Sequence, residues 1–224
     1  MNYVSHADLG GQPGHGIVTP EPEGELWHAA WEPRALALTL AAGATGQWNI
    51  DISRSARETL PDYANLSYYE IWLQALIDLL EQRGMLYDDE LVQGHALHAA
   101  PPVPRALRAA DVAAVLARGA PTERAATGVA RYAVGHRVRM RAGAVPHHTR
   151  LPGYVRGKVG MVQAVNGAHV FADTHAQGLG EQPCWLYTVA FSGAELWGDE
   201  GAAQCMTVSV DAWEPYMVPY MEPA

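Results

Sequence analysis

"HRVRMR", residues 136–141, is the stretch at which the sequence changes from helical patterns to strand patterns. Basic and apolar residues alternate strictly in it, which predicts a strand with Val138 and Met140 facing one way. Strand-like stretches follow at residues 158–165, 169–173, 185–191 and 206–210, separated by Gly, Asn and Pro. Five short strands in about 80 residues indicate a small, strongly bent β-barrel.

Upstream of this stretch the sequence predicts helices. The first runs from Pro33, at a first-turn position, to Gly43, and a short second one lies within residues 49–60, capped by Asn49 or Asp51. The main helix occupies residues 65–84, capped by Asn65 or Ser67. Shorter helices are expected at 88–94 and 109–119. The fold class is therefore α+β, with residues 1–125 forming an N-terminal arm and helical domain and residues 126–224 forming an SH3-like β-barrel domain.

The first 24 residues are rich in Gly and Pro and have no periodicity, so they cannot build a core of their own. They are either disordered or an extended arm, and the sequence alone favours disorder. No run of 18 apolar residues exists and the start does not read as a signal peptide. Cys184 and Cys205 are therefore expected to be reduced thiols of a cytoplasmic protein.

Charge is unevenly distributed along the chain, whose net charge is -9. Residues 124–172 hold eight basic residues and no acidic one, whereas the remainder holds seven basic residues and all 24 acidic ones. This asymmetry fits a local anionic partner, with phosphate as the first candidate. Strands that expose arginine to solvent explain it equally well.

The sequence contains no complete active site of its own. It has no nucleophile elbow, phosphate-binding loop or dinucleotide fingerprint, and the basic stretch has too few interleaved aromatics for nucleic-acid binding. We expect no metal site in this chain, because none of its histidine groups has closed ligand spacing. These groups are His95 with His98, His147 with His148, and His169 with Asp173 and His175. A subunit whose chemistry is completed by a partner fits this pattern.

Several motifs, taken together and in order, carry a resemblance. They are "DLGGQPGHG" (8–16), "SYYEIW" (67–72), "GHRVR" (135–139), "HHTRLPGYVRGKVG" (147–160), "DTHAQGLGE" (173–181) and "LYTVAFSGAELWG" (186–198). On these the chain resembles the β subunit of nitrile hydratase. The resemblance covers essentially the whole length, is strongest over residues 132–198 and is poor over 84–128.

The resemblance implies an enzyme, a hydro-lyase that converts a nitrile and water to an amide and is active only as the αβ complex. This is an obligate heterodimer with an α subunit, expected to pair again to α2β2, with no nucleic-acid or membrane partner. The family's metal is Co(III), which the overall similarity favours, or Fe(III), and the α subunit alone holds it, by three cysteine sulfurs and two backbone amides. Two of those cysteines are oxidised, and two β-subunit arginines hydrogen-bond their oxygens.

The motifs transfer roles to particular residues. Arg156 in "YVRGK" matches one family arginine. Arg54 in "DISRSARE" matches the other, although Ser53 and Arg57 stand where the family has apolar residues, so Arg57 remains a rival for the second arginine. Charge-assisted donors of this kind suit arginine, whose planar fork lysine cannot reproduce.

Softer matches concern the substrate pocket. Tyr68 matches a tyrosine that reaches toward the metal loop, and Trp72 matches an aromatic pocket residue, with plain core packing as its alternative. Ile50 and Ser53 match positions that shape the pocket, and a serine there is expected to widen it or favour polar nitriles. The resemblance also implies that the N-terminal arm wraps along the α subunit.

Two other functions remain open from the sequence. One is a thiocyanate hydrolase-type subunit, whose related chains split this architecture into separate polypeptides. The other is a non-catalytic accessory protein for metal insertion, which would resemble only the helical half.

Overall fold

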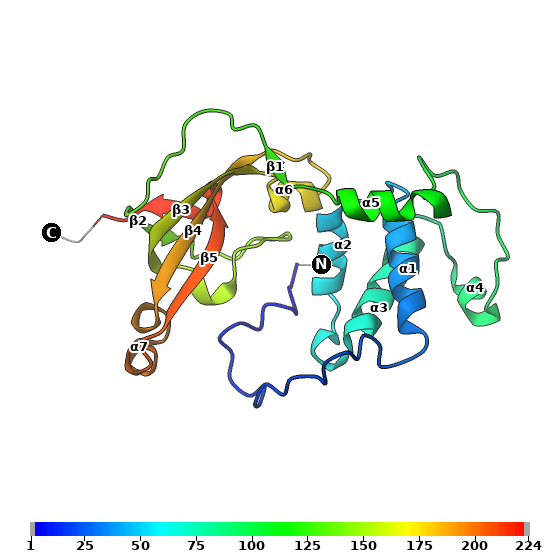
Figure 1. The fold of residues 1–224 in the computed structure, drawn as a ribbon, viewed down its shortest axis with the longest axis horizontal. Coiled ribbons are helices and arrows are strands. Elements are labelled where there is room, and N and C mark those ends of the chain that lie inside the picture. The colour runs from blue at the N-terminus through cyan, green and yellow to red at the C-terminus, as the bar shows by residue number, and fades with distance from the viewer. Residues whose placement is uncertain (1–2, 222–224) are drawn as a thin grey trace. The chain divides into compact units, whose positions relative to one another are not determined.

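The computed structural model describes residues 3–221 and divides into two compact units, Met1–Gly119 and Ala120–Ala224 (Figure 1). It is a mixed helix and sheet fold, with helices in the first unit and an antiparallel sheet in the second. Within the described range, no helix is long and apolar enough to cross a bilayer. Cys184 and Cys205 are free thiols, as predicted.

The first unit is built around helix α3. Its helices are α1 (Glu32–Gly43), α2 (Ile50–Glu58), α3 (Tyr68–Glu81), α4 (Asp88–Gln93) and α5 (Val112–Arg118), with 3-10 turns at Tyr63–Asn65 and Ala109–Asp111. Helices α1 and α2 both pack on α3, where Trp48, Leu76 and Leu79 form a buried core (Figure 1). The predicted helices are confirmed.

The structure shows which of the predicted residues cap helices α2 and α3. The Asn49 side chain accepts the backbone N–H groups of Asp51 and Ile52 at 3.1 and 2.9 Å, so Asn49 caps α2. Ser67 precedes α3, and its backbone N–H donates to the Glu70 carboxylate at 2.7 Å. Asp51 as cap is therefore wrong, and so is Asn65, because Asp51 lies inside α2 and Asn65 lies in a 3-10 turn.

The arm ahead of α1 forms no helix or strand within residues 3–31. Near its start, the backbone N–H of His6 donates to the carbonyl of Glu58 at 2.7 Å, at the end of α2. Ile17 and Val18, farther along, are almost fully exposed. The arm therefore contacts its own unit near His6 and leaves these apolar side chains in solvent.

The second unit is a sheet of short antiparallel strands. They are β1 (Glu123–Arg124), β2 (Arg137–Met140), β3 (Val159–His169), β4 (Cys184–Ser192), β5 (Thr207–Trp213) and β6 (Met217–Pro219), in the order β5-β4-β3-β2-β6 with β1 also on β3. Val138 and Met140 are buried while their basic neighbours are exposed, as the alternation predicted. In the described part of the chain β5 and β6 remain edges, so a closed barrel is not confirmed.

One predicted strand is wrong. Residues 169–173 were expected to be extended, but β3 ends at His169 and the short helix α6 (Ala172–Ala176) follows. The Phe171 carbonyl accepts both the Thr174 hydroxyl and the His175 N–H at 3.1 Å, which closes a helical turn where the apolar pattern favoured a strand. Side-chain bonding by Thr to nearby backbone competes with strand pairing here.

Helix α7 (Gly193–Ala203) was not predicted. Ser192 caps it by accepting the Glu195 N–H at 3.2 Å, and the helix kinks at Trp197 and Gly198. Gly193 and Gly201 bring their backbones so close that a Cβ on either would overlap the other. Glycine at these two positions lets α7 fold back on itself beside the sheet.

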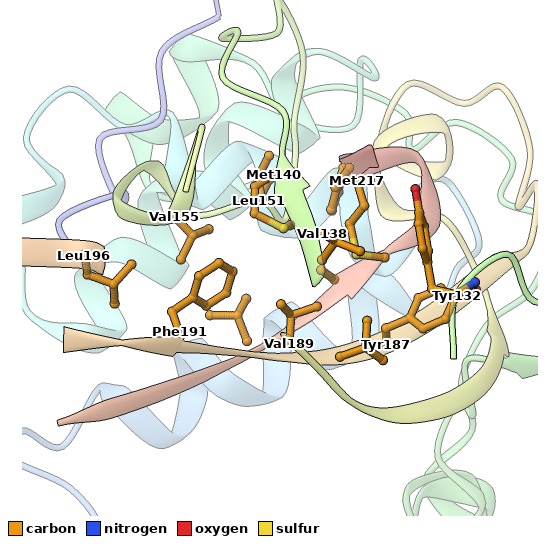
Figure 2. Packing of buried hydrophobic residues seen from close by; sticks show 14 residues of the cluster. Tyr132, Val138, Met140, Leu151, Val155, Tyr187, Val189, Phe191, Leu196 and Met217 are labelled. Carbon is orange, nitrogen blue, oxygen red and sulfur yellow. Dashed lines mark hydrogen bonds between the residues drawn. The ribbon is translucent and has the colours of Figure 1, made fainter. Parts of the chain in front are cut away.

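The core of the second unit gathers side chains from strands and connecting segments. Figure 2 shows Val138 and Met140 of β2, Val189 and Phe191 of β4, and Val155 of the segment before β3 pointing into one cluster. Each of these five is at most 1% exposed. The segment that carries Arg156 is therefore anchored through Val155 in the core.

A buried carboxylate organises the connection after α4 in the first unit. Glu90 accepts the backbone N–H groups of Tyr87, Leu97 and His98 at 3.1, 2.8 and 3.1 Å. The bonds from Leu97 and His98 are the main cause that lowers the pKa of Glu90. This carboxylate holds a loop that has no helix or strand of its own.

We predict that the Leu97 and His98 amides lose protection from hydrogen exchange as the pH falls. Because the pKa of Glu90 is lower in the folded than in the unfolded state, its stabilising contribution is complete above the unfolded value of about 4.3 and is lost as pH falls through the folded value. Exchange of these amides measured between pH 7 and pH 3 checks this. The control Glu90→Gln should show fast exchange that depends little on pH beyond the intrinsic rate; identical profiles for both chains would contradict the prediction.

Candidate functional site

Helix α2 carries both candidate arginines of the first unit, and they have different surroundings. Arg54 donates through Nη1 to Asp51 Oδ1 at 3.2 Å, one turn earlier on the helix. The Arg54 side chain is 38% exposed, whereas that of Asp51 is 7% exposed. Asp51 therefore orients a guanidinium that solvent, or a partner, can still reach.

Arg57 is engaged inside its own unit. Its Cζ lies 3.9 Å from the centroid of the Trp72 ring, and Nη2 donates to Ser53 Oγ at 3.1 Å. Burial is the largest cause that lowers the pKa of Arg57. A cation stacked on an indole face and bonded to a buried hydroxyl joins α2 to α3.

The start of α3 presents the two predicted aromatic residues on one face. Tyr68 and Trp72 are one turn apart, with ring centroids 5.6 Å from each other. Tyr68 is 64% exposed. Its ring also meets Tyr69 edge-on, with centroids 5.1 Å apart. The Tyr68 side chain is thus fixed by neighbouring rings and remains accessible.

Ile50 and Ser53, the other predicted pocket residues, differ in exposure. Ile50, the first residue of α2, is 52% exposed. Ser53 is buried, and its hydroxyl is occupied by the Arg57 guanidinium. Ser53 therefore helps to fix the position of the Arg57 side chain. The sequence did not predict this contact. The spacing Ser53-x-x-x-Arg57, one helical turn, was the available signal.

We predict a measurable coupling between Arg57 and Trp72. In a double-mutant cycle with Arg57→Met and Trp72→Leu, urea unfolding should give an interaction free energy of about 1 kcal/mol, typical of a partly desolvated cation–π pair. The same cycle with Arg54→Met in place of Arg57→Met is the matched control and should give none. Equal coupling in the two cycles would contradict the assignment.

Arg156 belongs to the second unit, directly after the 3-10 turn Gly153–Val155 and before β3. Its side chain is half-buried, and Nη2 donates to the Leu151 carbonyl at 3.2 Å. It borders a pocket of about 240 Å³. The polar residues that share this pocket are Arg141, His147, Thr149, Asp173, Thr174 and Gln177.

The pocket gathers two of the sequence motifs. Its lining includes residues from both 147–156 and 173–177, although these stretches are separated along the chain by the length of β3. From the sequence, His147 and Asp173 were candidates only for metal ligands in separate clusters. It did not anticipate that they lie together beside Arg156.

The segment that carries Arg156 is tied to the start of α7. Lys158 Nζ donates to the Glu195 carbonyl at 2.9 Å, and the Val159 N–H donates to the Glu195 carboxylate at 2.7 Å. The rings of Tyr154 and Trp197 stack, with centroids 6.1 Å apart. The backbone on both sides of Arg156 is therefore held by one short stretch.

Other basic residues of the acid-free stretch are used within the second unit. Arg124 makes a bidentate pair with Glu181 at 2.7 Å, and Arg137 lies 4.5 Å from the centroid of the Tyr220 ring. Acidic and aromatic residues from later in the chain thus fold back onto the basic stretch. This geometry favours the structural explanation of the charge asymmetry over a phosphate site.

Metal-ligating side chains are not gathered in the part of the chain that the structure describes. Across residues 3–221, no group of three or more His, Cys, Asp and Glu residues could hold a metal ion. The donors that both units offer at their candidate sites are guanidinium groups. Such groups suit anionic partners rather than a cation.

The chain matches two protein-family models that together span most of its length. They are described as nitrile hydratase beta subunit, N-terminal, over residues 1–115, and nitrile hydratase beta subunit, C-terminal, over residues 121–219. The chain is 39% identical over 221 residues to the low-molecular weight cobalt-containing nitrile hydratase subunit beta of Rhodococcus rhodochrous, covering 95% of this chain and 97% of that one. It is 31% identical over 219 residues to the cobalt-containing nitrile hydratase subunit beta of Pseudonocardia thermophila, covering 94% of each chain.

A solved structure is also similar in part. The recombinant apo-enzyme of thiocyanate hydrolase from Thiobacillus thioparus is 26% identical, over 42% of this chain and 78% of that chain, with a TM-score of 0.39.

Proposed function

The chain belongs to the nitrile hydratase β-subunit family, and on that premise we propose that it completes a nitrile-hydrating site whose metal is held by an α subunit. The product is the amide that corresponds to the nitrile. The observation that supports this role is the placement of Arg156, a half-buried guanidinium with an anchored backbone, at the edge of a pocket that also holds Asp173 and His147. This chain offers cationic donors where a partner would bring anionic groups.

The cofactor proposed is cobalt, named in two of the similar β subunits. The resemblance implies iron as the other candidate. The metal, when bound, supplies Lewis-acid activation of the nitrile. In this proposal, the residues of this chain contact the ligands of the metal and not the metal itself. Arg54 and Arg156 would donate hydrogen bonds to the oxygens of the oxidised cysteines of the α subunit. Each such charge-assisted bond is worth about 1.5–3 kcal/mol.

The contacts of α2 support Arg54 rather than Arg57 as the second arginine. The Arg57 guanidinium already lies on the face of the Trp72 ring and donates a hydrogen bond to Ser53. Arg54 is oriented by Asp51 and is 38% exposed. An arginine that recognises a partner's anion must remain accessible in the isolated chain.

The substrate pocket is proposed to use Tyr68 and Trp72 of α3 together with Ile50 and Ser53 of α2. Exposed Ile50 and Tyr68 would meet the nitrile or the metal loop directly. Trp72 and buried Ser53 would shape the wall through Arg57. Small-molecule nitriles are the proposed substrates.

We propose that the chain forms an obligate αβ heterodimer, which pairs to α2β2. We also propose two domains, with the boundary between them near residue 125 of the sequence, and an SH3-like barrel as the second domain. The two compact units and the short, bulged antiparallel strands support the domain proposals. The free thiols of Cys184 and Cys205 suit a cytoplasmic location.

The alternatives have less support. An accessory protein would match only the helical half, whereas this chain matches the family over both halves. A thiocyanate hydrolase-type subunit is not favoured, since relatives named as nitrile hydratase cover nearly the whole chain.

We predict that Arg156→Lys leaves an assembled αβ complex whose turnover falls by about a hundredfold or more, because lysine cannot supply the planar fork. Size-exclusion chromatography and amide production from a nitrile measure the two outcomes. Arg137→Lys, an exposed arginine of the same unit that lies outside the pocket, is the control and should keep normal turnover. Near-normal turnover in Arg156→Lys would refute the proposed role.

Arg54→Lys and Arg57→Lys should separate the two candidates of α2. We expect Arg54→Lys to lower turnover at nearly unchanged stability. We expect Arg57→Lys to lower the urea midpoint and to keep most of the turnover, because it weakens a cation–π contact inside the unit. The opposite pattern would make Arg57 the second arginine.

A further inference from the structure

The pocket beside Arg156 is built on a buried carboxylate. Asp173, the second residue of α6, is 4% exposed. Burial is the largest cause that raises the pKa of Asp173, since the charged form loses its hydration. A carboxylate in this position needs hydrogen-bond donors, and the chain supplies them from other segments.

The first donor is a buried tyrosine. The Tyr216 hydroxyl donates to Asp173 Oδ1, and Tyr216 itself is 5% exposed. The same hydroxyl accepts the backbone N–H of Arg150 at 3.0 Å. Tyr216 therefore connects the carboxylate of α6 to the backbone of the segment that leads to Arg156.

Further contacts come from that same segment. The Thr149 hydroxyl hydrogen-bonds Asp173, and His147 Nδ1 lies 3.7 Å from Asp173 Oδ2. Thr149 Oγ1 also accepts the Leu151 N–H at 3.3 Å. Residues 147–151 are thus fixed at several points to one carboxylate and one hydroxyl.

The fixed segment ends at the group that receives the Arg156 side chain. The Leu151 carbonyl accepts Arg156 Nη2 at 3.2 Å, and Leu151 directly follows the residue whose amide Tyr216 holds. A shift of residues 149–151 would move this acceptor, and with it the guanidinium. The contacts therefore run from Asp173 through Tyr216 and Thr149 to Leu151 and Arg156.

We infer that Asp173 and Tyr216 are positioning residues for Arg156. They hold the Leu151 carbonyl in place, and with it the guanidinium that donates to this carbonyl. This inference rests on the proposed role of Arg156. It adds two residues that act through another group and need not touch substrate.

The expected consequence is catalytic, because an error of about 1 Å in the placement of a catalytic donor costs on the order of a hundredfold in rate. Tyr216→Phe removes the hydroxyl and keeps the ring that packs against Phe171, 5.6 Å away between centroids. We expect this variant of the αβ complex to lose about ten- to a hundredfold in kcat, with KM nearly unchanged. The optical absorption of the metal centre should shift in the same direction as in Arg156→Lys.

The decisive comparison is non-additivity. If Tyr216 acts through Arg156, the double variant Tyr216→Phe with Arg156→Lys should be no slower than Arg156→Lys alone. Losses that multiply would overturn the inference, as would an assembled Tyr216→Phe complex with normal kcat. Near-normal turnover of Arg156→Lys alone would overturn both the inference and the proposed function, whereas the other two outcomes leave the proposed function standing.

The chain offers a matched control. Tyr187 is fully buried in the same unit, and its hydroxyl donates at 2.5 Å to the carboxylate of Glu214, which lies in the same 3-10 turn as Tyr216, Glu214–Tyr216. Tyr187→Phe removes a bond of the same type and should lower thermal stability while keeping kcat. An equal loss of kcat in Tyr187→Phe would show a general structural effect and contradict positioning.

If Tyr216→Phe assembles poorly, Asp173→Asn, which keeps the shape of the side chain, is expected to lower kcat in the same non-additive way.

Discussion

A buried carboxylate is costly unless it accepts hydrogen bonds. In the second unit this constraint applies to Asp173, which is buried. Tyr216 follows β5 and Thr149 precedes β3, so satisfying one carboxylate brings distant segments together. The core supports this arrangement, since Val155 beside Arg156 is packed against Phe191 of β4 (Figure 2). The backbone next to Arg156 is therefore anchored in the core of the second unit.

The two units use arginine in two distinct ways. Several guanidinium groups make contacts inside their own unit. Arg57 lies on the Trp72 ring, and Arg124 donates to the Glu181 carboxylate. Arg54 instead donates to Asp51 and Arg156 to the Leu151 carbonyl, and both arginines remain partly exposed. That division explains how a chain of net charge -9 can hold an acid-free basic stretch without being a phosphate-binding protein. It also fits a subunit that stabilises anionic groups of a partner.

Local sequence signals predicted what depends on neighbours in the chain. The helices of the first unit, the caps at Asn49 and Ser67 and the alternation in β2 all follow from spacing within one or two turns. Residues 169–173 were misassigned because Thr174 closes a turn that apolar pattern cannot reveal. The Asp173–Tyr216 contact joins residues 43 positions apart, and helix α7 depends on a close approach of Gly193 and Gly201. Such contacts become visible only in three dimensions.

We propose that this chain completes a site in an α subunit instead of holding one by itself. The most direct measurement is metal content and nitrile hydration for the co-purified αβ complex and for each chain purified separately. We predict about one cobalt ion per αβ pair, amide production by the complex only, and neither metal nor activity in this chain by itself. Stoichiometric metal in this chain alone, or a metal-loaded complex that hydrates no nitrile, would contradict it.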